Sequence, residues 1–299
     1  MRKRIATGKK TGTRRKAAVM RADWYTTITV PSWEDLQREY EDRFALRGRR
    51  WVFRGHQQAN WDLKPSLERA VCDRFGLAHK TMIGIEDYLL SRFQRNLHRF
   101  QSRVPAQEDR LEWLALMQHH GAPTRLLDWT YSCYIALFFA LEMASPDSTC
   151  AIWAIDQVWL FNQLEQRQER ASRSAFAKDP ELRAPAAVQA LLASNIKSIA
   201  PLVPYYLNER LSVQQGVFLT PLHLEVSFMD NLRAVGTPAE LRKNVIKIEI
   251  PVVRKVQYQM LMSLERLNVH RLSLFPGIDG FAQSLQLSPL WWHRDSYRE

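Results

Sequence analysis

Two short segments of this chain set charged residues into apolar surroundings, which restricts how it can fold. Residues 51–55 read Trp-Val-Phe-Arg-Gly, and residues 119–130 read His-His-Gly-Ala-Pro-Thr-Arg-Leu-Leu-Asp-Trp-Thr. The apolar residues in each segment predict a short buried strand. A buried Arg or Asp costs several kcal/mol unless it is paired or hydrogen-bonded. Arg54, Arg125 and Asp128 must therefore satisfy one another inside the fold or face a ligand.

Hydrophobic periodicity along the rest of the chain predicts one mixed α+β domain. The 299 residues are 46% hydrophobic, which is ordinary for a globular protein with a real core. Neither an internal repeat nor a long Pro/Gly linker divides residues 24–299. Strands are expected over residues 51–53, 124–128, 150–155, 213–220 and 245–250. Helices are expected over residues 33–47, 85–101, 108–120, 133–144, 157–170, 185–196, 254–267 and 278–287.

The cysteine and hydropathy patterns indicate a soluble protein of a reducing compartment. Cys72, Cys133 and Cys150 are an odd number with no Cys-x-x-Cys spacing, which disfavours a disulfide framework or a zinc site. The longest apolar run, residues 133–141, is far shorter than the roughly 20 residues of a membrane span. No apolar segment of a signal peptide follows the basic start. We therefore expect a cytoplasmic protein that does not enter a membrane.

The positive charge of the chain is concentrated near its N-terminus. Residues 1–22 hold nine Lys and Arg, from Arg2 to Arg21, and no acid, so only +2 of the formal charge of +11 belongs to the rest. A segment of this composition cannot bury a core, so residues 1–23 are expected to form a disordered tail. The tail would either bind the phosphate backbone of a nucleic acid or serve only as a solvated end.

Three motifs in the first half of the chain stand out by their length and composition. They are Phe53-Arg54-Gly55, the Trp-Asp-Leu-Lys-Pro-Ser-Leu of residues 61–67, and the string over residues 116–130. Together they resemble the FRG domain family, which is named for its Phe-Arg-Gly motif. Residues 136–140, 208–218 and 274–280 extend the similarity, which covers roughly residues 33–287. One departure is His56, where the family usually has Gln directly after the Phe-Arg-Gly motif.

A more distant similarity suggests a chemistry. The Phe53-Arg54-Gly55 motif, followed by residues 128–132 leading into residues 136–140, resembles the order of motifs in ADP-ribosyltransferases of the Arg-Ser-Glu class. This resemblance implies a split, mainly antiparallel sheet with surrounding helices, NAD as the substrate, and ADP-ribosyltransferase activity. The third motif departs from the class, because Gln214-Gln215-Gly216 stands where the strand with the catalytic Glu should be.

The resemblance gives five residues a role at NAD. Arg54 would anchor the phosphates or a ribose through its planar fork of donors. Gly55 would let the backbone approach the ligand closely. Thr130 and Ser132 would shape the nicotinamide pocket. Gln214 would hydrogen-bond a ribose hydroxyl, but it lacks the charge that stabilises a cationic transition state.

The missing carboxylate leaves alternatives open. Asp128 or Glu209 could replace it, or the site could bind without efficient turnover. His119 could be a general base or a ligand contact, whereas His120 is expected only to satisfy the end of its helix. Arg125 is expected to be structural. Asp128 could also be structural, although on one extended strand it would point to the face opposite Arg125.

Three classes of function follow, in order of preference. The first is an ADP-ribosyltransferase-like enzyme that modifies nucleic acid, which implies a toxin or anti-phage defence effector with an antitoxin or regulatory protein as partner. The second is a non-catalytic module that binds a nucleotide or a partner. A nuclease ranks last, because no carboxylate cluster with metal-ligand spacing is present. Convergence of Arg54, Thr130 and Gln214 in one cleft would favour a ligand site, whereas an Arg54 closed off by Asp128 in a packed core would favour a structural role.

Overall fold

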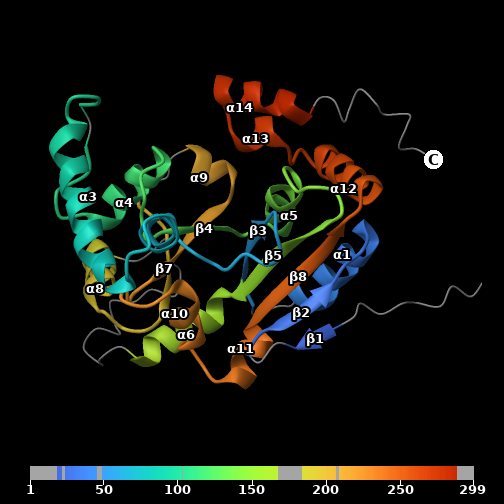
Figure 1. Ribbon diagram of the computed structural model, residues 1–299, viewed down its shortest axis with the longest axis horizontal. Coiled ribbons are helices and arrows are strands. Elements are labelled where there is room, and N and C mark those ends of the chain that lie inside the picture. The colour runs from blue at the N-terminus through green and yellow to red at the C-terminus, as the bar shows by residue number, and fades with distance from the viewer. Residues whose placement is uncertain are drawn as a thin grey trace, which may run out of the picture.

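Helices surround one large sheet in the computed structural model (Figure 1). The structure describes residues 19–21, 24–45, 49–102, 104–167, 184–206 and 209–287. The strands are β1 (Val19–Arg21), β2 (Thr26–Thr29), β3 (Trp51–His56), β4 (Leu127–Thr130), β5 (Ser148–Asp156), β6 (Ile199–Leu202), β7 (Gly216–Pro221) and β8 (Val245–Val252). The α-helices are α1 (Trp33–Glu39), α2 (Ser66–Glu68), α3 (Met82–Leu97), α4 (Arg110–His119), α5 (Cys133–Leu141), α6 (Gln157–Arg167), α8 (Pro185–Ala193), α9 (Glu209–Val213), α10 (Phe228–Arg233), α11 (Pro238–Asn244), α12 (Arg254–Arg266), α13 (Arg271–Leu274) and α14 (Ile278–Ser284). Single turns of π- or 3₁₀-helix cover Tyr40–Phe44, Arg69–Arg74, His79–Thr81 and Leu285–Leu287.

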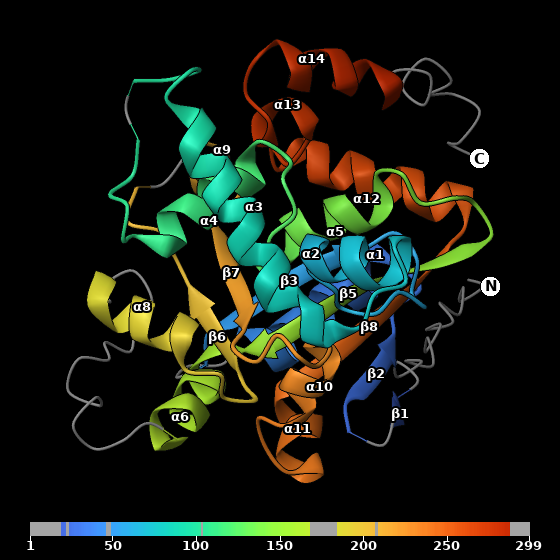
Figure 2. The ribbon, with the colours of Figure 1, turned by 60° about the vertical axis from the view of Figure 1, so that its left-hand side comes forward.

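The sheet is mainly antiparallel. Its described strands follow the order β1-β2-β8-β5-β3-β4-β7-β6, and among them only β2 and β8 run parallel. In Figure 2, α1, α5 and α12 lie on one side of the sheet, and α6, α10 and α11 lie on the other. The helices α3, α4 and α8 pack together beside β6 and β7. The expected mixed domain with a mainly antiparallel sheet is confirmed.

Alternation along β5 explains why helices cover both faces of the sheet. Cys150, Ile152 and Ala154 belong to the core under α5 and α12. Trp153 and Ile155 belong to a second core with α6, α10 and α11. Because successive side chains of a strand point to opposite faces, an apolar run of this length buries both faces of the sheet.

The sheet is nearly divided between β3 and β4. β3 shares six residue pairs with β5, and β4 shares four with β7. Between β3 and β4 the register holds a single pair, Phe53 with Thr130. The sheet therefore consists of two half-sheets, β1-β2-β8-β5-β3 and β4-β7-β6. They meet at the Phe53–Thr130 pair, and the described residues of β3 and β4 form no other residue pair.

Differences between the predicted and observed elements have local causes. β4 begins at Leu127 instead of residue 124, because Ser66 and Leu67 hold Thr124 in a loop through hydrogen bonds of 3.0 Å. β2 and β6 were not predicted, since four residues are too few to show a period. The predicted tail over residues 1–23 lies outside the described residues, except for Val19–Arg21, which form β1 against β2.

Gly55 allows α5 to pack directly on β3. A Cβ at Gly55 would fall on the carbonyl oxygen of Ala136 and within 2.6 Å of the amide nitrogen of Ala140. Both are backbone atoms of α5, one turn apart, so neither can swing away as a side chain would. The close approach that was expected between Gly55 and a ligand is thus made by a helix, although Gly55 also lines the cavity described below.

Gly55→Ala is expected to lower the free energy of unfolding by about 3 kcal/mol, because the added methyl overpacks the β3–α5 contact. Gly84→Ala on α3 is the matched control, since nothing lies within 4 Å of a Cβ there. Alanine should stabilise that helix by about 0.5–1 kcal/mol. Urea denaturation of both variants checks the difference. Equal stabilities would contradict the packing argument.

Candidate functional site

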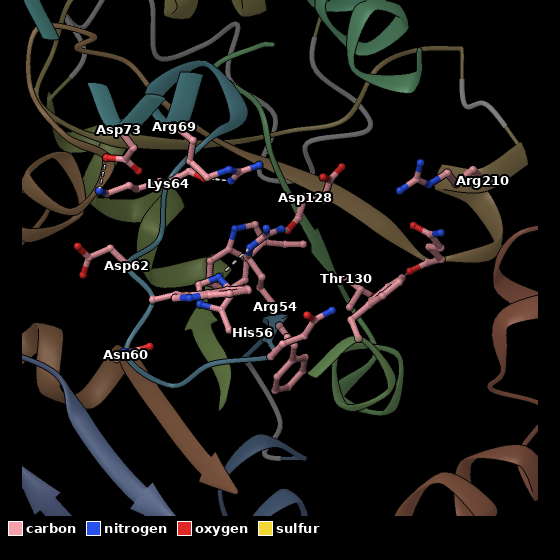
Figure 3. Close-up of a pocket in the computed structure, with 17 residues that line it drawn as sticks. Arg54, His56, Asn60, Asp62, Lys64, Arg69, Asp73, Asp128, Thr130 and Arg210 are labelled. Atoms are coloured by element: carbon pink, nitrogen blue, oxygen red, sulfur yellow. Dashed lines mark hydrogen bonds and ion pairs between the residues drawn. The ribbon is translucent and has the colours of Figure 1, made fainter. Parts of the chain in front are cut away.

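A cavity of about 690 Å³ opens beside the Phe53–Thr130 pair (Figure 3). Its volume lies within the roughly 300–1,000 Å³ of small-molecule sites. The end of β3, the loop and turn after it, β4, α5 and the segment around α9 all contribute to its lining. Arg54, Thr130 and Gln214 line it together. This is the convergence that favours a ligand site.

The Arg54 guanidinium connects the two half-sheets. Its Nη1 donates to the main-chain carbonyl of Asp128 at 2.6 Å, and its Nε donates to Nε2 of His56 at 3.3 Å. Burial lowers the pKa of Arg54 to about 10; the Asp128 charge opposes this shift and the Arg69 charge adds to it. Arg54 is still charged at pH 7. Two of its five N–H donors make these bonds, and the planar fork suits a phosphate.

His56 supports Arg54 as a hydrogen-bond acceptor. The side chain is buried, and burial together with the Arg54 charge lowers its pKa to about 3. The ring is therefore neutral at pH 7. Because Arg54 donates to Nε2, the proton of the ring resides on Nδ1. The glutamine that is usual at this position of the family would also offer Arg54 an acceptor, so the departure at His56 preserves this role.

A chain of hydrogen bonds positions Asp128. Gln118 donates from Nε2 to Oδ1 of Asp128 at 2.9 Å, and Thr124 donates from Oγ1 to Oε1 of Gln118. The amide of Thr124 donates to Oγ of Ser66 at 3.0 Å. The motif over residues 61–67 therefore anchors the motif over 116–130, which in turn holds the carboxylate of Asp128 at the cavity.

Positive charge exceeds negative charge around the cavity. Lys64 and Asp73 form an ion pair at 2.9 Å and offset each other. The other charged lining residues are Arg54, Arg69, Arg210, Asp62 and Asp128. Three guanidinium groups thus accompany two carboxylates, and Trp61, which is 51% exposed, adds a ring face. Such a lining suits an anion that also carries a flat ring.

The polar groups of Thr130 and Gln214 are engaged within the fold. Thr130 donates from Oγ1 to the main-chain carbonyl of Gln214 at 2.7 Å and accepts from the amide of Ser132 at 3.1 Å. The Gln214 side chain donates to the carbonyl of Leu274 at 3.0 Å. The hydroxyl that was expected to shape a nicotinamide pocket is therefore used to fasten the 214–216 turn to β4.

Ser132 and His119 do not line this cavity. Ser132 caps α5 by accepting from the amide of Ile135 at 3.3 Å. Its contact with NAD stays a prediction that the lining of this cavity does not support. His119 lines a separate cavity with Tyr205 and Tyr206. Its catalytic role stays a prediction that the lining of this cavity does not support, because Gln118 faces Asp128 and the next residue of a helix points about 100° away.

Glu209 and Arg125 also lie outside the lining. Glu209 begins α9 and is exposed, so the lining of this cavity gives no support to Glu209 as the replacement for the missing carboxylate. Arg125 is 4% exposed and forms a buried ion pair with Glu86 of α3 at 2.5 Å. The structural role expected of Arg125 is confirmed, but its partner is Glu86 and not Asp128.

Several residues of the cavity were not singled out from the sequence, among them Trp61, Arg210 and Arg69. Trp61 lies in a recognised motif, and Arg210 lies in the segment over residues 208–218 that extends the family similarity. Arg69 follows the first of these by two residues. Membership of a motif is the signal that could have found the first two, whereas no local pattern indicates Arg69.

The described part of the chain shows neither a metal-binding cluster nor a membrane-spanning helix. No three His, Cys, Asp or Glu side chains gather there in a group that could hold a metal ion. No helix within those residues has the length and apolar character needed to cross a membrane.

Comparison with known proteins agrees with the motifs for part of the chain. A family model described as the FRG domain matches residues 49–149. This stretch includes β3, α2 to α5 and the start of β5, and with them Arg54, His56 and Asp128. Arg210 and Gln214 lie beyond it. No curated protein and no solved structure matches the chain. The match to the FRG domain is thus shown for residues 49–149, about a third of the chain.

Proposed function

We propose that the cavity between β3 and β4 binds NAD and that the protein is an ADP-ribosyltransferase-like enzyme. The main support is the placement of Arg54 beside Asp128, where the two half-sheets meet, in a cavity with an excess of cations. A dinucleotide carries a pyrophosphate, two riboses and two flat rings. It therefore needs cations, hydrogen-bonding groups and aromatic surface in one cavity.

The lining residues divide these tasks between them. Arg54, Arg69 and Arg210 would bind the pyrophosphate, since a planar guanidinium can donate two parallel hydrogen bonds to one phosphate. The ring of Trp61 would stack on one of the flat rings of NAD. His56 would keep the guanidinium of Arg54 oriented by accepting from its Nε.

In the proposed reaction the bond between nicotinamide and C1′ of its ribose breaks, and the departing nitrogen keeps the electron pair. A nucleophile of the acceptor forms the new bond to C1′ and loses its proton to a base or to water. Positive charge builds on the ribose in between, and a preorganised carboxylate stabilises it. Asp128 is the residue that we propose for this role, because it lines the cavity, whereas Glu209 does not and Gln214 carries no charge.

The alternative is a module that binds NAD or a similar nucleotide without turning it over. None of the described residues that line the cavity is a glutamate, and the Thr130 hydroxyl already bonds within the fold. Such a module would hold its ligand through the same three arginines. The enzyme itself would suit a toxin or anti-phage defence effector that an antitoxin or other regulatory protein keeps in check.

Asp128→Asn tests the enzyme directly. Removal of the carboxylate is expected to slow nicotinamide release, and label transfer from NAD to RNA, DNA or lysate protein, by about 100- to 1,000-fold. The affinity for NAD should be kept or rise, because a negative charge near the pyrophosphate is removed. Asn can still accept the hydrogen bond that Gln118 donates, so the fold should be unaffected.

Asp87→Asn serves as the control, because Asp87 is an exposed acid on α3 outside the cavity. If the wild-type protein binds NAD but releases no nicotinamide, the binding module replaces the enzyme. If the folded protein does not bind NAD at all, both proposals are wrong.

A further inference from the structure

A second cavity, of about 480 Å³, lies on the other side of the Phe53–Thr130 pair. β3 and β4 are antiparallel, so residues that precede Phe53 face residues that follow Thr130. Accordingly, Arg54 and Asp128 line the first cavity, and Trp51 and Tyr131 line the second. Phe53 lines both, so the two cavities share one wall.

Two adjacent arginines and several aromatic rings line the second cavity. Arg49 and Arg50 precede β3 and are exposed. The guanidinium of Arg50 lies 4.2 Å from the centre of the Tyr131 ring, and that of Arg49 lies 5.6 Å from the centre of the Trp51 ring. Tyr40 adds a further ring to the lining. Cations held against rings can contact a phosphate while the rings contact a base.

The same two segments of the chain build both cavities. β3 contributes to the first cavity by its C-terminal half and to the second by its start. The turn after α9 places Gln214 at the first cavity and Gln215 at the second. Gln215 has a φ of 48°, a left-handed conformation that is uncommon for a residue with a side chain. Strain of this kind is concentrated at ligand-binding and switch positions.

We infer that the second cavity binds one nucleotide of a single-stranded nucleic acid. Arg50 would contact the phosphate backbone, and the base would stack on an aromatic ring of the wall. Arg49 lies 3.7 Å from Asp156 and would add a weaker contact. Stacking and arginine contacts together are the usual basis of single-strand binding. A base inside a duplex is stacked on its neighbours and would have to be flipped out of the helix before it could enter the cavity, so a single strand is favoured.

The position of the cavity also indicates what the bound strand would do, a step that rests on the proposed function. Arg50 and Arg54 are four residues apart on or next to one strand, which is roughly 13 Å. A single-stranded nucleic acid held at Arg50 would therefore bring its neighbouring nucleotides to the entrance of the proposed NAD cavity. The bound strand would then be the acceptor of the ADP-ribosyl group.

Binding can be measured without NAD, so the inference can fail or succeed independently of the proposed reaction. The full chain is titrated into fluorescein-labelled octamers of uridine and of thymidine, and into a DNA duplex, with fluorescence anisotropy as the readout. Arg50→Gln is expected to weaken binding of the single strands about tenfold and to make the salt dependence less steep. Binding of the duplex should change by less than about twofold, because its stacked bases do not enter the cavity that Arg50 lines.

Arg92→Gln is the charge-matched control, since it removes the same charge from α3, and Arg92 lines neither of the two cavities. Its affinity for the octamers should equal that of the wild-type protein. The inference is overturned if Arg50→Gln and Arg92→Gln have equal effects, or if Arg50→Gln weakens single strands and duplex alike. A preference for the uridine or the thymidine octamer identifies RNA or DNA as the strand that is bound.

Discussion

Arg54→Ala is expected to weaken the binding of NAD by about 100-fold and to reduce nicotinamide release at least as much. Hydrogen bonds to charged groups contribute about 1.5–3 kcal/mol each, and a bidentate contact with a phosphate is lost with the side chain. A loss of about 3 kcal/mol corresponds to about 100-fold in affinity. The substitution also leaves the Asp128 carbonyl and Nε2 of His56 without the donor that joins the two half-sheets. Isothermal titration calorimetry with NAD measures the affinity.

Arg54→Lys separates the charge of Arg54 from its shape. Lysine keeps a positive charge but lacks the planar fork, so an affinity between those of the wild-type protein and Arg54→Ala is expected. Circular dichroism of both variants checks that the sheet is retained. If folded Arg54→Ala binds NAD as tightly as the wild-type protein does, then the ligand does not occupy the cavity beside β3.

Glu86→Ala is expected to lower the free energy of unfolding by about 3–5 kcal/mol. The Glu86 carboxylate is fully buried and accepts from Nε of Arg125 at 2.8 Å and from Nη2 of Arg110 at 2.6 Å. Burial acts to raise the pKa of Glu86, but the two arginines outweigh it and hold that pKa below its ordinary value. Without Glu86 the buried guanidinium of Arg125 has lost its counter-charge. The measurement is the midpoint of urea denaturation.

Asp87→Ala is the matched control for this buried ion pair. Asp87 is the next residue of α3 and accepts from the same Nη2 of Arg110 at the same distance of 2.6 Å, yet its side chain is 54% exposed. Exposed pairs contribute about 0–1 kcal/mol, so little change is expected. Similar losses in Glu86→Ala and Asp87→Ala would show that burial does not determine the strength of these pairs.

Much of the fold could be predicted because its signals are local. The apolar residues 133–141 predict a helix, and the structure has it with Ser132 as its N-cap, since hydrophobic periodicity and a capping residue are both local signals. β3 was predicted from three residues but extends to His56, because β5 supplies six pairing partners. β2 and β6 have only four residues each, so their identity depends on the strands beside them.

Some residues of the candidate site could be recognised from the local sequence, whereas others are brought to it only by tertiary packing. Arg54 and Asp128 were identified from the cost of placing charge among apolar residues, and both line the cavity. His119 belongs to the same motif, yet it faces another cavity, because the rotation of one residue along α4 turns it away. Arg69 was missed, since only the packing of the chain after β3 brings it near Arg54.

The sequence by itself determined the similarity to the FRG domain over residues 49–149, the mixed fold class and the residues that could not be buried without a partner. Those properties follow from composition, periodicity and motifs, which are readable one segment at a time. Only the tertiary structure decided which partner each charge finds. Arg125 pairs with Glu86, 39 residues away, and Arg54 reaches the carbonyl of Asp128, 74 residues away. Such contacts depend on strand register and helix packing, which arise when distant segments meet and leave no trace in any one of them.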